Sequence, residues 1–324
     1  MVKVVSFDAT GGPEVMRIID ADLPPPGRGE LRVRHTAIGL NFIDTYHRSG
    51  LYPIPLPGRL GLEAAGVVEA VGPGVNGFAV GDRIAYGNGP RGAYAETANV
   101  PANRVLKLVP GVSDETAAGM MLKGMTVSFL TRQTYTVKSG DTVVFLPAAG
   151  GVGLIFGQWV KALGARAIGV VGSDDKIETA KAHGYEHVLN SRKDDIAKRV
   201  KEITGGAGVP VVYDGVGKAT FMASLDCLRP RGLMVSFGNA SGPVTGVDLG
   251  ILAAKGSLYV TRPSLLTYAA NDSDLERLGR DVLDMVSSGK VKIGINQRYP
   301  LADVISAHRD LENRRTTGTT ILIP

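Results

Sequence analysis

The stretch DTVVFLPAAGGVGLIFGQWVKALG, residues Asp141–Gly164, decides the fold of this 324-residue chain. It begins with an apolar run, passes through a glycine-rich turn with the spacing A-x-G-x-x-G, and continues as a helical pattern. A strand, a tight glycine turn and a helix in this order are the context of a dinucleotide-binding fingerprint. We expect Gly150 to let the backbone approach a pyrophosphate and Gly153 to let the helix pack close to the strand, with the helix N-terminus offering N–H groups to phosphates. An ordinary turn without a ligand remains the alternative.

The end of the next expected strand, Ala165–Val171, indicates which dinucleotide binds. An NAD site usually has an acidic residue there to bind the ribose 2′-hydroxyl. This chain instead has Gly172-Ser173, with Lys176 nearby. A missing acid, a small hydroxyl and a cation favour a 2′-phosphate, and therefore NADPH. The acids Asp174-Asp175 argue against this interpretation, and Lys176 as a solvated helix residue stays open as an alternative.

Composition places the chain among ordinary globular proteins. It is 44% hydrophobic and 21% charged, and its length suits two domains. The net charge of +5 is dispersed, which is poor evidence for nucleic-acid binding. A single cysteine, Cys227, excludes an intrachain disulfide and a cysteine-cluster metal site. Because neither a signal peptide nor an apolar run of about 18 residues is evident, we expect a cytoplasmic protein.

Residues 1–120 have the pattern of a β-rich domain. Short apolar or alternating runs are separated by Gly and Pro, which predicts a partly closed barrel or sandwich. Only Asn41–Arg48 looks helical there, and a further helix is expected to begin at Asp114 with Ser113 as its N-cap. The expected strands are Lys3–Phe7, Glu30–Ala37, Ala64–Val71, Arg83–Tyr86, Ala93–Val100 and Val105–Leu108.

From about residue 124 to 261, strands alternate with helices, which predicts an α/β domain with a doubly wound parallel sheet of six strands. The turns Tyr213–Gly217 and Ser236–Asn239 follow its fourth and fifth strands and should line the cofactor groove. In the tail, we expect helices over Leu275–Ser288 and Ala302–Asn313 and a last strand over Thr319–Ile323, so that the β-rich domain is discontinuous. The six strands are expected at Thr142–Leu146, Ala167–Val171, His187–Leu189, Val209–Tyr213, Leu233–Phe237 and Ser257–Val260, and the helices between them at Val152–Leu163, Asp175–His183, Asp194–Thr204, Ala219–Cys227 and Asp248–Ala254.

This organisation resembles the medium-chain dehydrogenase/reductase superfamily. Several stretches resemble more closely its zinc-free quinone oxidoreductases, the zeta-crystallin-like NADPH:quinone reductases. The resemblance implies a GroES-like catalytic domain of residues 1–123 and 264–324 and a Rossmann NADPH-binding domain of residues 124–263. The stretches are GLNFIDTYHRSGLY (Gly39–Tyr52), GDRIAYGNGPRGAYAE (Gly81–Glu96), LKGMT (Leu122–Thr126), PAAGGVGL (Pro147–Leu154), LDCLRPRGLMVSFGNASG (Leu225–Gly242) and GSLYVTRPSL (Gly256–Leu265).

The resemblance also indicates that no zinc is bound. Relatives with a catalytic zinc have a histidine in a G-H-E segment, which here reads Gly61-Leu62-Glu63, and the segment around Asn41 has no cysteine. Each of the five histidines is expected to be a surface or structural residue. Without a metal Lewis acid, alcohol oxidation loses its means of stabilising an alkoxide, whereas reduction of an electron-poor quinone by NADPH remains feasible.

Site residues follow from the same resemblance. Asn41, Tyr46 and Tyr52 match positions that line the cleft between the domains, where a quinone and the nicotinamide should bind. Lys123 and Thr126 match positions on the nicotinamide side. The alternatives are that Tyr52 is a packing aromatic and that Asn41 is a turn-capping amide.

The remaining cofactor contacts are expected along the Rossmann domain and the tail. The 2′-phosphate pocket of the family corresponds to Gly172, Ser173, Lys176, Ser191 and Arg314. Relatives often have an aromatic ring in place of Ser191, and neighbouring Arg192 is a candidate to compensate for its loss. Arg315, next to Arg314, is the alternative for the contact from the tail. The dinucleotide turn contributes Ala149, Gly150, Gly151, Val152 and Gly153, and the later turns contribute Gly217, Phe237 and Gly238.

The family further implies a homodimer that pairs through the edge strand near Ser257–Val260. Other readings of the function remain open. Within enzymes, the alternative is NADPH-dependent reduction of an enone or alkenal double bond. From a different class, the alternative is a nucleic-acid-binding or crystallin-like structural role, for which no aromatic-basic motif is evident. A zinc alcohol dehydrogenase is the third.

Overall fold

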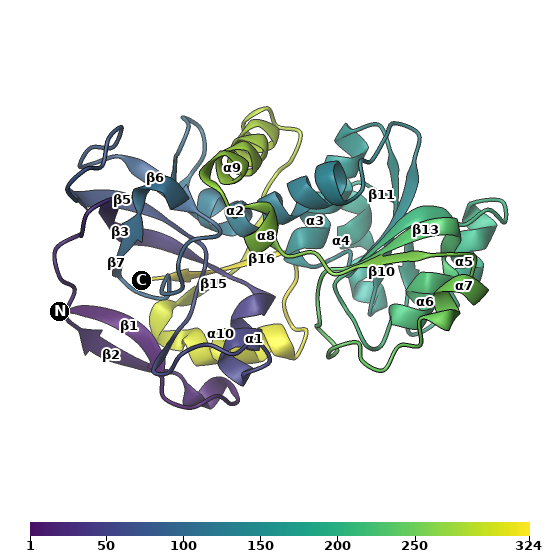
Figure 1. Cartoon of the computed structure of the whole chain (residues 1–324), viewed down its shortest axis with the longest axis horizontal. Helices are drawn as coiled ribbons and strands as arrows, with labels where there is room; N and C mark the ends of the chain where they lie inside the picture. The colour runs from purple at the N-terminus through teal and green to yellow at the C-terminus, as the bar shows by residue number, and fades with distance from the viewer. The chain divides into compact units, whose positions relative to one another are not determined.

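The computed structural model describes residues 1–324, and the chain divides into two compact units. Unit 1 comprises residues 1–125, 269–289 and 293–324, and unit 2 comprises residues 126–268 and 290–292. The first boundary falls within helix α2 (Asp114–Phe129). Figure 1 labels the elements along the chain.

Unit 2 is built on a parallel sheet, and its six strands confirm the predicted doubly wound fold. The strand order is β11-β10-β9-β12-β13-β14, so the order reverses between β9 and β12. Helices α3 and α4 cover one face of the sheet and α5, α6 and α7 cover the other (Figure 1). The strands are β9 (Thr142–Leu146), β10 (Arg166–Val171), β11 (Tyr185–Asn190), β12 (Val209–Asp214), β13 (Leu228–Ser236) and β14 (Tyr259–Thr261), and the helices are α3 (Gly151–Ala162), α4 (Ile177–Ala182), α5 (Ile196–Ile203), α6 (Phe221–Asp226) and α7 (Gly250–Ala254).

Burial explains why the central strands are continuously apolar. Every residue of β12 is buried, as expected of a strand covered on both faces. Several expected boundaries differ from the structure, and the largest difference is that β13 begins at Leu228, five residues before the expected Leu233. The expected helix from Asp175 begins as a 3₁₀ turn (Asp174–Lys176) before α4, and β14 begins two residues later than expected because Ser257 adopts a left-handed φ of 57°. Unit 2 also contains a π-helical turn (Leu130–Thr134) and α8 (Leu265–Tyr268).

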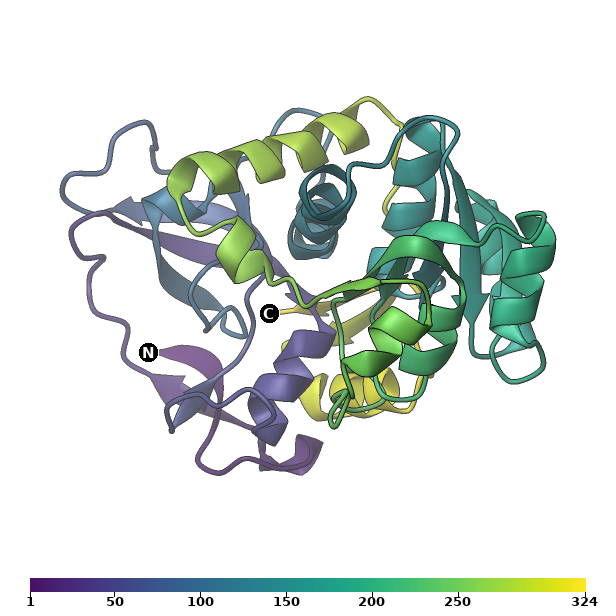
Figure 2. The ribbon, with the colours of Figure 1, turned by 45° about the vertical axis from the view of Figure 1, so that its right-hand side comes forward.

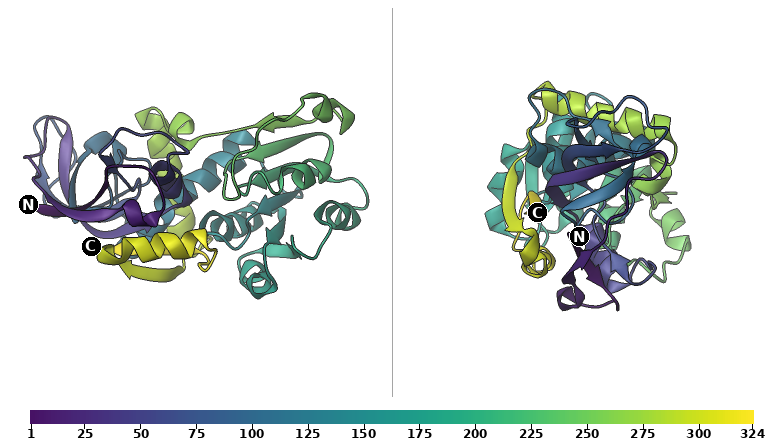
Figure 3. Two further views of the ribbon diagram at one scale, coloured as in Figure 1. Left: turned by 90° about the horizontal axis from the view of Figure 1, so that it is seen from below. Right: turned by 90° about the vertical axis from the view of Figure 1, so that its left-hand side faces the viewer.

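Unit 1 is the β-rich unit. A seven-stranded sheet has the order β15-β16-β3-β5-β6-β8, with β7 also paired to β3, and a three-stranded sheet has the order β2-β1-β4. The C-terminal strand β16 pairs antiparallel with β3, which brings the tail into the same sheet as the head of the chain. Figure 3 shows both termini in this unit. The strands are β1 (Val2–Phe7), β2 (Arg17–Ala21), β3 (Glu30–Leu40), β4 (Gly58–Arg59), β5 (Ala64–Val71), β6 (Arg83–Tyr86), β7 (Thr97–Pro101), β8 (Leu106–Lys107), β15 (Ile295–Pro300) and β16 (Thr319–Ile323).

Three helices and the first part of α2 complete unit 1. They are α1 (Phe42–Ser49), α9 (Asp272–Ser287) and α10 (Val304–Glu312), with 3₁₀ turns at Pro13–Val15, Ala102–Arg104 and Leu301–Asp303. Helix α9 packs on α2, where Val282 occupies the space that a side chain at Gly124 would need (Figure 2). Ser113 caps α2 as predicted, since its hydroxyl accepts from the N–H of Thr116 at 3.1 Å. No helix is both long enough and apolar enough to cross a membrane.

Candidate functional site

The dinucleotide turn of unit 2 joins β9 to α3, and its two glycines differ in what surrounds them. A Cβ atom at Gly153 would lie within 3.0 Å of the carbonyl oxygens of Pro147 and Ala148, closer than real Cβ atoms come. A Cβ atom at Gly150 would meet nothing nearer than the Pro147 carbonyl oxygen at 3.4 Å, an ordinary contact. Gly153 is therefore required by helix–strand packing, whereas Gly150 could accept a Cβ atom in ordinary contact and leaves room at the start of the helix.

The room at the start of the helix fits a phosphate group. Gly150 is the N-cap of α3 with an extended backbone (φ −81°, ψ 169°), and the first turn of α3 has no acidic side chain. The free N–H groups and the positive end of a 12-residue helix are therefore available to an anion. Ala149, Gly151 and Val152, which the sequence predicted for the same contacts, belong to this turn and the first helical residues.

The ends of β10 and β11 bring the predicted 2′-phosphate residues together. Val171 pairs with Asn190 in the parallel register, and the N–H of Ser191 donates to the Val171 carbonyl at 2.9 Å. Ser191 therefore lies beside the Gly172-Ser173 turn. No atom lies within 4 Å of the position of a Cβ at Gly172, so that position is open. Lys176 lies in the 3₁₀ turn that follows.

Asp174, which argued for NAD in the sequence, is held by its neighbours. Its carboxylate accepts from the Asn190 amide at 2.6 Å and forms an ion pair with Lys193, and these two contacts lower the pKa of Asp174. A carboxylate held in this way is turned to its own strand neighbours, so its presence does not contradict a 2′-phosphate pocket. Arg314 belongs to unit 1, between α10 and β16, where it has a left-handed φ of 60°.

A buried carboxylate that the sequence did not single out organises the next turns of unit 2. Asp214 ends β12 and accepts four hydrogen bonds of 2.7–3.0 Å, two from backbone N–H groups and two from hydroxyls. One of the N–H groups is that of Gly217, which has φ 91°. Phe237 donates its N–H to the Asp214 carbonyl at 2.8 Å, and a Cβ at Gly238 would collide with Gly215. The predicted residues Gly217, Phe237 and Gly238 thus converge on one pair of turns.

In unit 1, the predicted residues Asn41 and Lys123 are joined through Glu63. The Asn41 side-chain amide donates to Glu63 Oε2 at 2.8 Å, and the Lys123 ammonium donates to the same oxygen at 2.9 Å. Glu63 Oε1 accepts from the backbone N–H of Leu122 at 2.8 Å. All side chains of this cluster are buried, and that of Glu63 is completely so. The sequence had treated Glu63 only as part of a segment that lacks a zinc histidine.

Asn41 also caps helix α1. It forms a capping box with Asp44, whose Oδ2 accepts from the Asn41 backbone N–H at 2.9 Å and from the Tyr94 hydroxyl at 2.8 Å. Burial raises the pKa of the Asp44 carboxyl to about 7, although these hydrogen bonds and Lys123 oppose the rise. Asp44 Oδ1 is buried and has no hydrogen-bond partner. The capping role that was the alternative for Asn41 is therefore present together with the contact to Glu63.

The polar network continues from Tyr94 into the packing of α1 against α10. The Tyr94 hydroxyl lies 3.2 Å from His308 Nε2, and Arg48 Nη1 lies 2.9 Å from His308 Nδ1. Burial and the Arg48 charge lower the pKa of His308 to about 3, so the ring is neutral and Nδ1 accepts from Arg48. Arg48 also pairs with Glu312 at 2.6 Å. Since a guanidinium does not release its proton, this chain of contacts fixes α1 rather than conducting protons.

The two predicted tyrosines pack against one another in unit 1. The rings of Tyr46 and Tyr52 meet edge to face at 5.1 Å, and the Tyr52 N–H donates to the Tyr46 carbonyl at 3.0 Å. His47 contacts Tyr52 with ring centroids 6.2 Å apart. Tyr52 thus has the packing role that was its alternative, and it packs beside Tyr46. Thr126 is the first residue of unit 2.

The side chains present do not fit a zinc ion. No three His, Cys, Asp or Glu side chains are grouped so that they could hold a metal. Leu62 is a buried apolar residue at the position of the zinc histidine, and the Asn41 amide is bound to Glu63. Burial raises the pKa of Cys227 to about 12, which disfavours the thiolate that a metal needs.

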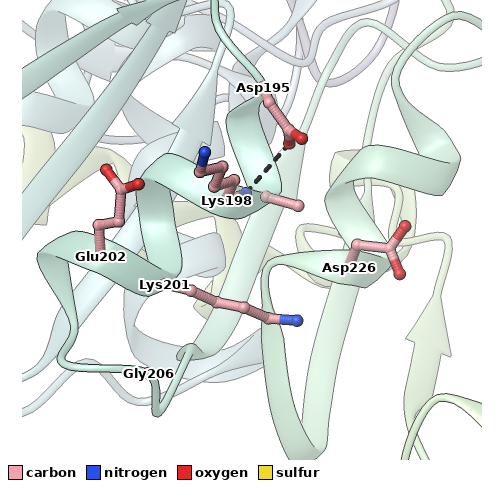
Figure 4. Close-up of a pocket in the computed structure, with 7 residues that line it drawn as sticks. Asp195, Lys198, Lys201, Glu202, Gly206 and Asp226 are labelled. Atoms are coloured by element: carbon pink, nitrogen blue, oxygen red, sulfur yellow. Dashed lines mark hydrogen bonds between the residues drawn. The ribbon is translucent and has the colours of Figure 1, made fainter.

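A hollow on the surface of unit 2 contains none of the predicted site residues. Figure 4 shows it along α5 and the end of α6, with side chains of both charges. Asp195 caps α5 by accepting from the Lys198 N–H at 3.1 Å, and Asp226 forms an ion pair with Lys255. Both aspartates are used within the fold, and the site predicted from the sequence lies elsewhere. The lining residues of the hollow are Asp195, Ala197, Lys198, Lys201, Glu202, Gly206 and Asp226.

Comparison with known proteins agrees with this arrangement. Residues 27–110 match the alcohol dehydrogenase GroES-like domain, and residues 151–274 match the zinc-binding dehydrogenase family. A quinone oxidoreductase of Pseudomonas aeruginosa is 52% identical over 100% of both chains, and a 2-haloacrylate reductase of a Burkholderia species is 43% identical over 100% of this chain and 99% of the relative. The crystal structure of Escherichia coli quinone oxidoreductase complexed with NADPH has a TM-score of 0.98 at 49% identity, covering 99% of this chain and 100% of that chain.

The fold and the matched domains define the class as a medium-chain dehydrogenase/reductase, which confirms the predicted superfamily. Several quinone oxidoreductases are 49–52% identical to this chain over its full length, which narrows the class to one family. The chain belongs to the quinone oxidoreductase family.

Proposed function

We propose that this protein is an NADPH:quinone oxidoreductase that transfers hydride without a metal. The observation that carries the proposal is the nucleotide site of unit 2. A Cβ atom at Gly150 would make only ordinary contacts, and the position at Gly172 is open. Ser191 lies beside the Gly172-Ser173 turn, and the Asp174 carboxylate is bound by Asn190 and Lys193. The relative from Escherichia coli, whose structure is described as complexed with NADPH, supports the same cofactor.

The hydride is supplied by NADPH when it is bound, and the residues of this chain bind and orient the reactants. Asn41 has already used its amide N–H groups toward Glu63 and, at 3.5 Å, the Gly39 carbonyl. Its carbonyl oxygen takes part in the capping box of α1 and has a second lone pair that can accept from a ligand. Asn41 therefore suits a donor such as a carboxamide NH₂ group and does not suit a quinone carbonyl. Tyr46 and Tyr52 are hydroxyl donors and are assigned to the quinone carbonyl oxygens.

This assignment is chemically sufficient because a quinone accepts hydride readily. The site needs to supply mainly proximity and a few hydrogen bonds. The aromatic pair formed by Tyr46 and the partly exposed Tyr52 suits a planar ring substrate.

The test is the initial rate of cofactor oxidation by the purified protein in metal-free buffer with a naphthoquinone. NADPH should be oxidised much faster than NADH. Equal rates would remove the 2′-phosphate pocket of Ser173, Lys176, Ser191 and Arg314 from the proposal. No rate with either cofactor would remove the quinone reductase function.

A second candidate is reduction of an activated carbon–carbon double bond. The observation that favours it is the relative named 2-haloacrylate reductase, at 43% identity. The same hydride donor and metal-free site would serve this reaction. Turnover of 2-chloroacrylate or an enone in the assay above, without turnover of a naphthoquinone, would favour this candidate.

We also propose that the protein forms a homodimer through β14. This strand is the edge of the unit 2 sheet, and its residues Tyr259 and Val260 are 62% and 40% exposed. An exposed apolar edge strand pairs readily with a second copy. Light scattering after size-exclusion chromatography should give twice the mass of one chain, and Val260→Pro, which removes a backbone donor, should give a monomer. A monomeric wild type would refute the proposal.

A further inference from the structure

Glu63 occupies an unusual position for a carboxylate, because its side chain is completely buried and water cannot solvate the charge. Burying an unpaired carboxylate is costly, and the cost is offset only when charge and hydrogen bonds are both satisfied. Glu63 meets this requirement with three donors at 2.8–2.9 Å. Of the three, only Lys123 supplies a positive charge.

The three donors fix the state of Glu63. The Asn41 amide and the Lys123 ammonium converge on Oε2, and the Leu122 N–H reaches Oε1, so both oxygens must be acceptors. Only an ionised carboxylate has this pattern. The surrounding backbone is shaped for it as well, since a side chain on Gly39 would collide with the Glu63 carboxylate.

We propose that Glu63 is the positioning residue of the site: it fixes the orientation of the Asn41 amide, while Lys123 balances its charge. Because the Asn41 nitrogen must face the carboxylate, the group that this side chain can offer to a ligand is the Asn41 oxygen, through the lone pair that the α1 capping box does not use. The inference rests on the proposed function only in assigning Asn41 a contact with the bound reactants.

The variant Glu63→Gln tests this directly. A glutamine amide has one accepting oxygen, so it leaves a donor unpaired at either Oε1 or Oε2 and lets the Asn41 amide turn. We expect kcat to fall roughly 10²-fold, the loss typical of a misplaced positioning contact, while the KM for the quinone changes much less. Glu69→Gln is the matched control, because Glu69 lies on β5, the strand that begins directly after Glu63, in an exposed pair with Arg34, and the substitution should leave kcat unchanged.

A double-mutant cycle with Asn41→Ser separates positioning from general disruption, because serine retains an N-cap oxygen for α1. If Glu63 acts through Asn41, the double variant should lose no more kcat than Asn41→Ser alone. Losses that multiply, or a Glu63→Gln variant with the kcat of the wild type, would overturn the proposal. If Glu63→Gln does not fold, Glu63→Asp retains the charge but is one methylene too short to reach all three donors, and the same two outcomes decide.

A second readout needs neither cofactor nor turnover. In the ligand-free protein with ¹⁵N-labelled asparagine, the Asn41 side-chain amide, assigned by its loss in Asn41→Ser, should exchange slowly with solvent, and Glu63→Gln should make the exchange fast. Unchanged exchange would contradict the proposal. If the wild type reduces an enone instead of a quinone, the proposed function fails, whereas the cycle measured with the enone still decides the role of Glu63.

Discussion

Two alanine substitutions in one turn should have opposite consequences. Gly153→Ala should destabilise the protein, and Gly150→Ala should leave its stability nearly unchanged while weakening NADPH binding. The two glycines are three residues apart, but only Gly153 has carbonyl oxygens within 3.0 Å of where a Cβ would lie. The pair therefore separates packing from ligand approach within one motif.

The magnitudes follow from the surroundings of each Cβ. At Gly153 the added methyl must displace the Pro147 and Ala148 backbone or shift α3, and overpacking of this kind costs roughly 1–3 kcal/mol. At Gly150 the backbone angles (φ −81°, ψ 169°) suit any residue and the nearest contact is 3.4 Å. We therefore expect a change of less than about 0.5 kcal/mol in the free energy of unfolding, the usual range for an unstrained site.

The affinity for NADPH should be reduced more by Gly150→Ala than by Gly153→Ala. A methyl on Gly150 occupies the space assigned to the pyrophosphate, and a clash of about 1.4–3 kcal/mol weakens binding roughly 10- to 150-fold. The assay is thermal unfolding of both ligand-free variants beside titration of NADPH followed by its fluorescence. Gly150→Ala with wild-type affinity for NADPH, or Gly153→Ala with the wild-type melting temperature, would refute the reasoning.

Three further predictions concern other parts of the two units. Gly172→Asp places a carboxylate in open space at the end of β10, and it should lower the ratio of kcat/KM with NADPH to that with NADH at least roughly 10-fold without lowering the melting temperature, which steady-state kinetics and thermal unfolding measure. Burial raises the pKa of Asp44 from 3.8 to about 7, so between these pH values the folded protein keeps a proton that the unfolded chain loses, and the free energy of unfolding falls as pH rises. The gain in stability of Asp44→Asn over the wild type, measured by urea denaturation, should therefore be larger at pH 8 than at pH 5. A gain that is equal or larger at pH 5 would contradict this sign. Asp214→Asn replaces one of two accepting oxygens by a donor and should cost roughly 2–4 kcal/mol in urea denaturation, whereas an unchanged midpoint would show that the turn at Gly217 does not depend on the carboxylate.

Local patterns allowed the sequence to predict the Rossmann half well. The strand Thr142–Leu146 has the predicted bounds, and so does the last strand of unit 1, Thr319–Ile323. Apolar β-branched runs between turn residues mark both strands without reference to the rest of the chain. In contrast, β2 and β15 were not predicted. Their residues are half-buried or exposed, so their pattern is not apolar, and they become strands only by pairing with β1 and β16.

The buried cluster around Glu63 shows why the site was harder to predict than the fold. Its contacts join residues 22, 59 and 60 positions apart, and no periodic pattern in the sequence records such pairings. The sequence showed Glu63 beside Leu62, where the zinc histidine of relatives is replaced, and that observation predicted that no zinc binds without indicating which contacts Glu63 makes.

Buried charges around Asn41 organise this part of unit 1. Two completely buried carboxylates, Glu63 and Asp44, both bind Asn41, one through its side-chain amide and the other through its backbone N–H. A single buried ammonium, that of Lys123, balances one of the two charges. The second carboxylate therefore takes up a proton more readily than an ordinary aspartate, which is the direction in which burial raises the pKa of Asp44. Asn41 is thus bound from two sides by carboxylates whose charges influence one another. Removing the Lys123 charge should therefore raise the proton affinity of Asp44 and make the ionised form of Glu63 less favourable.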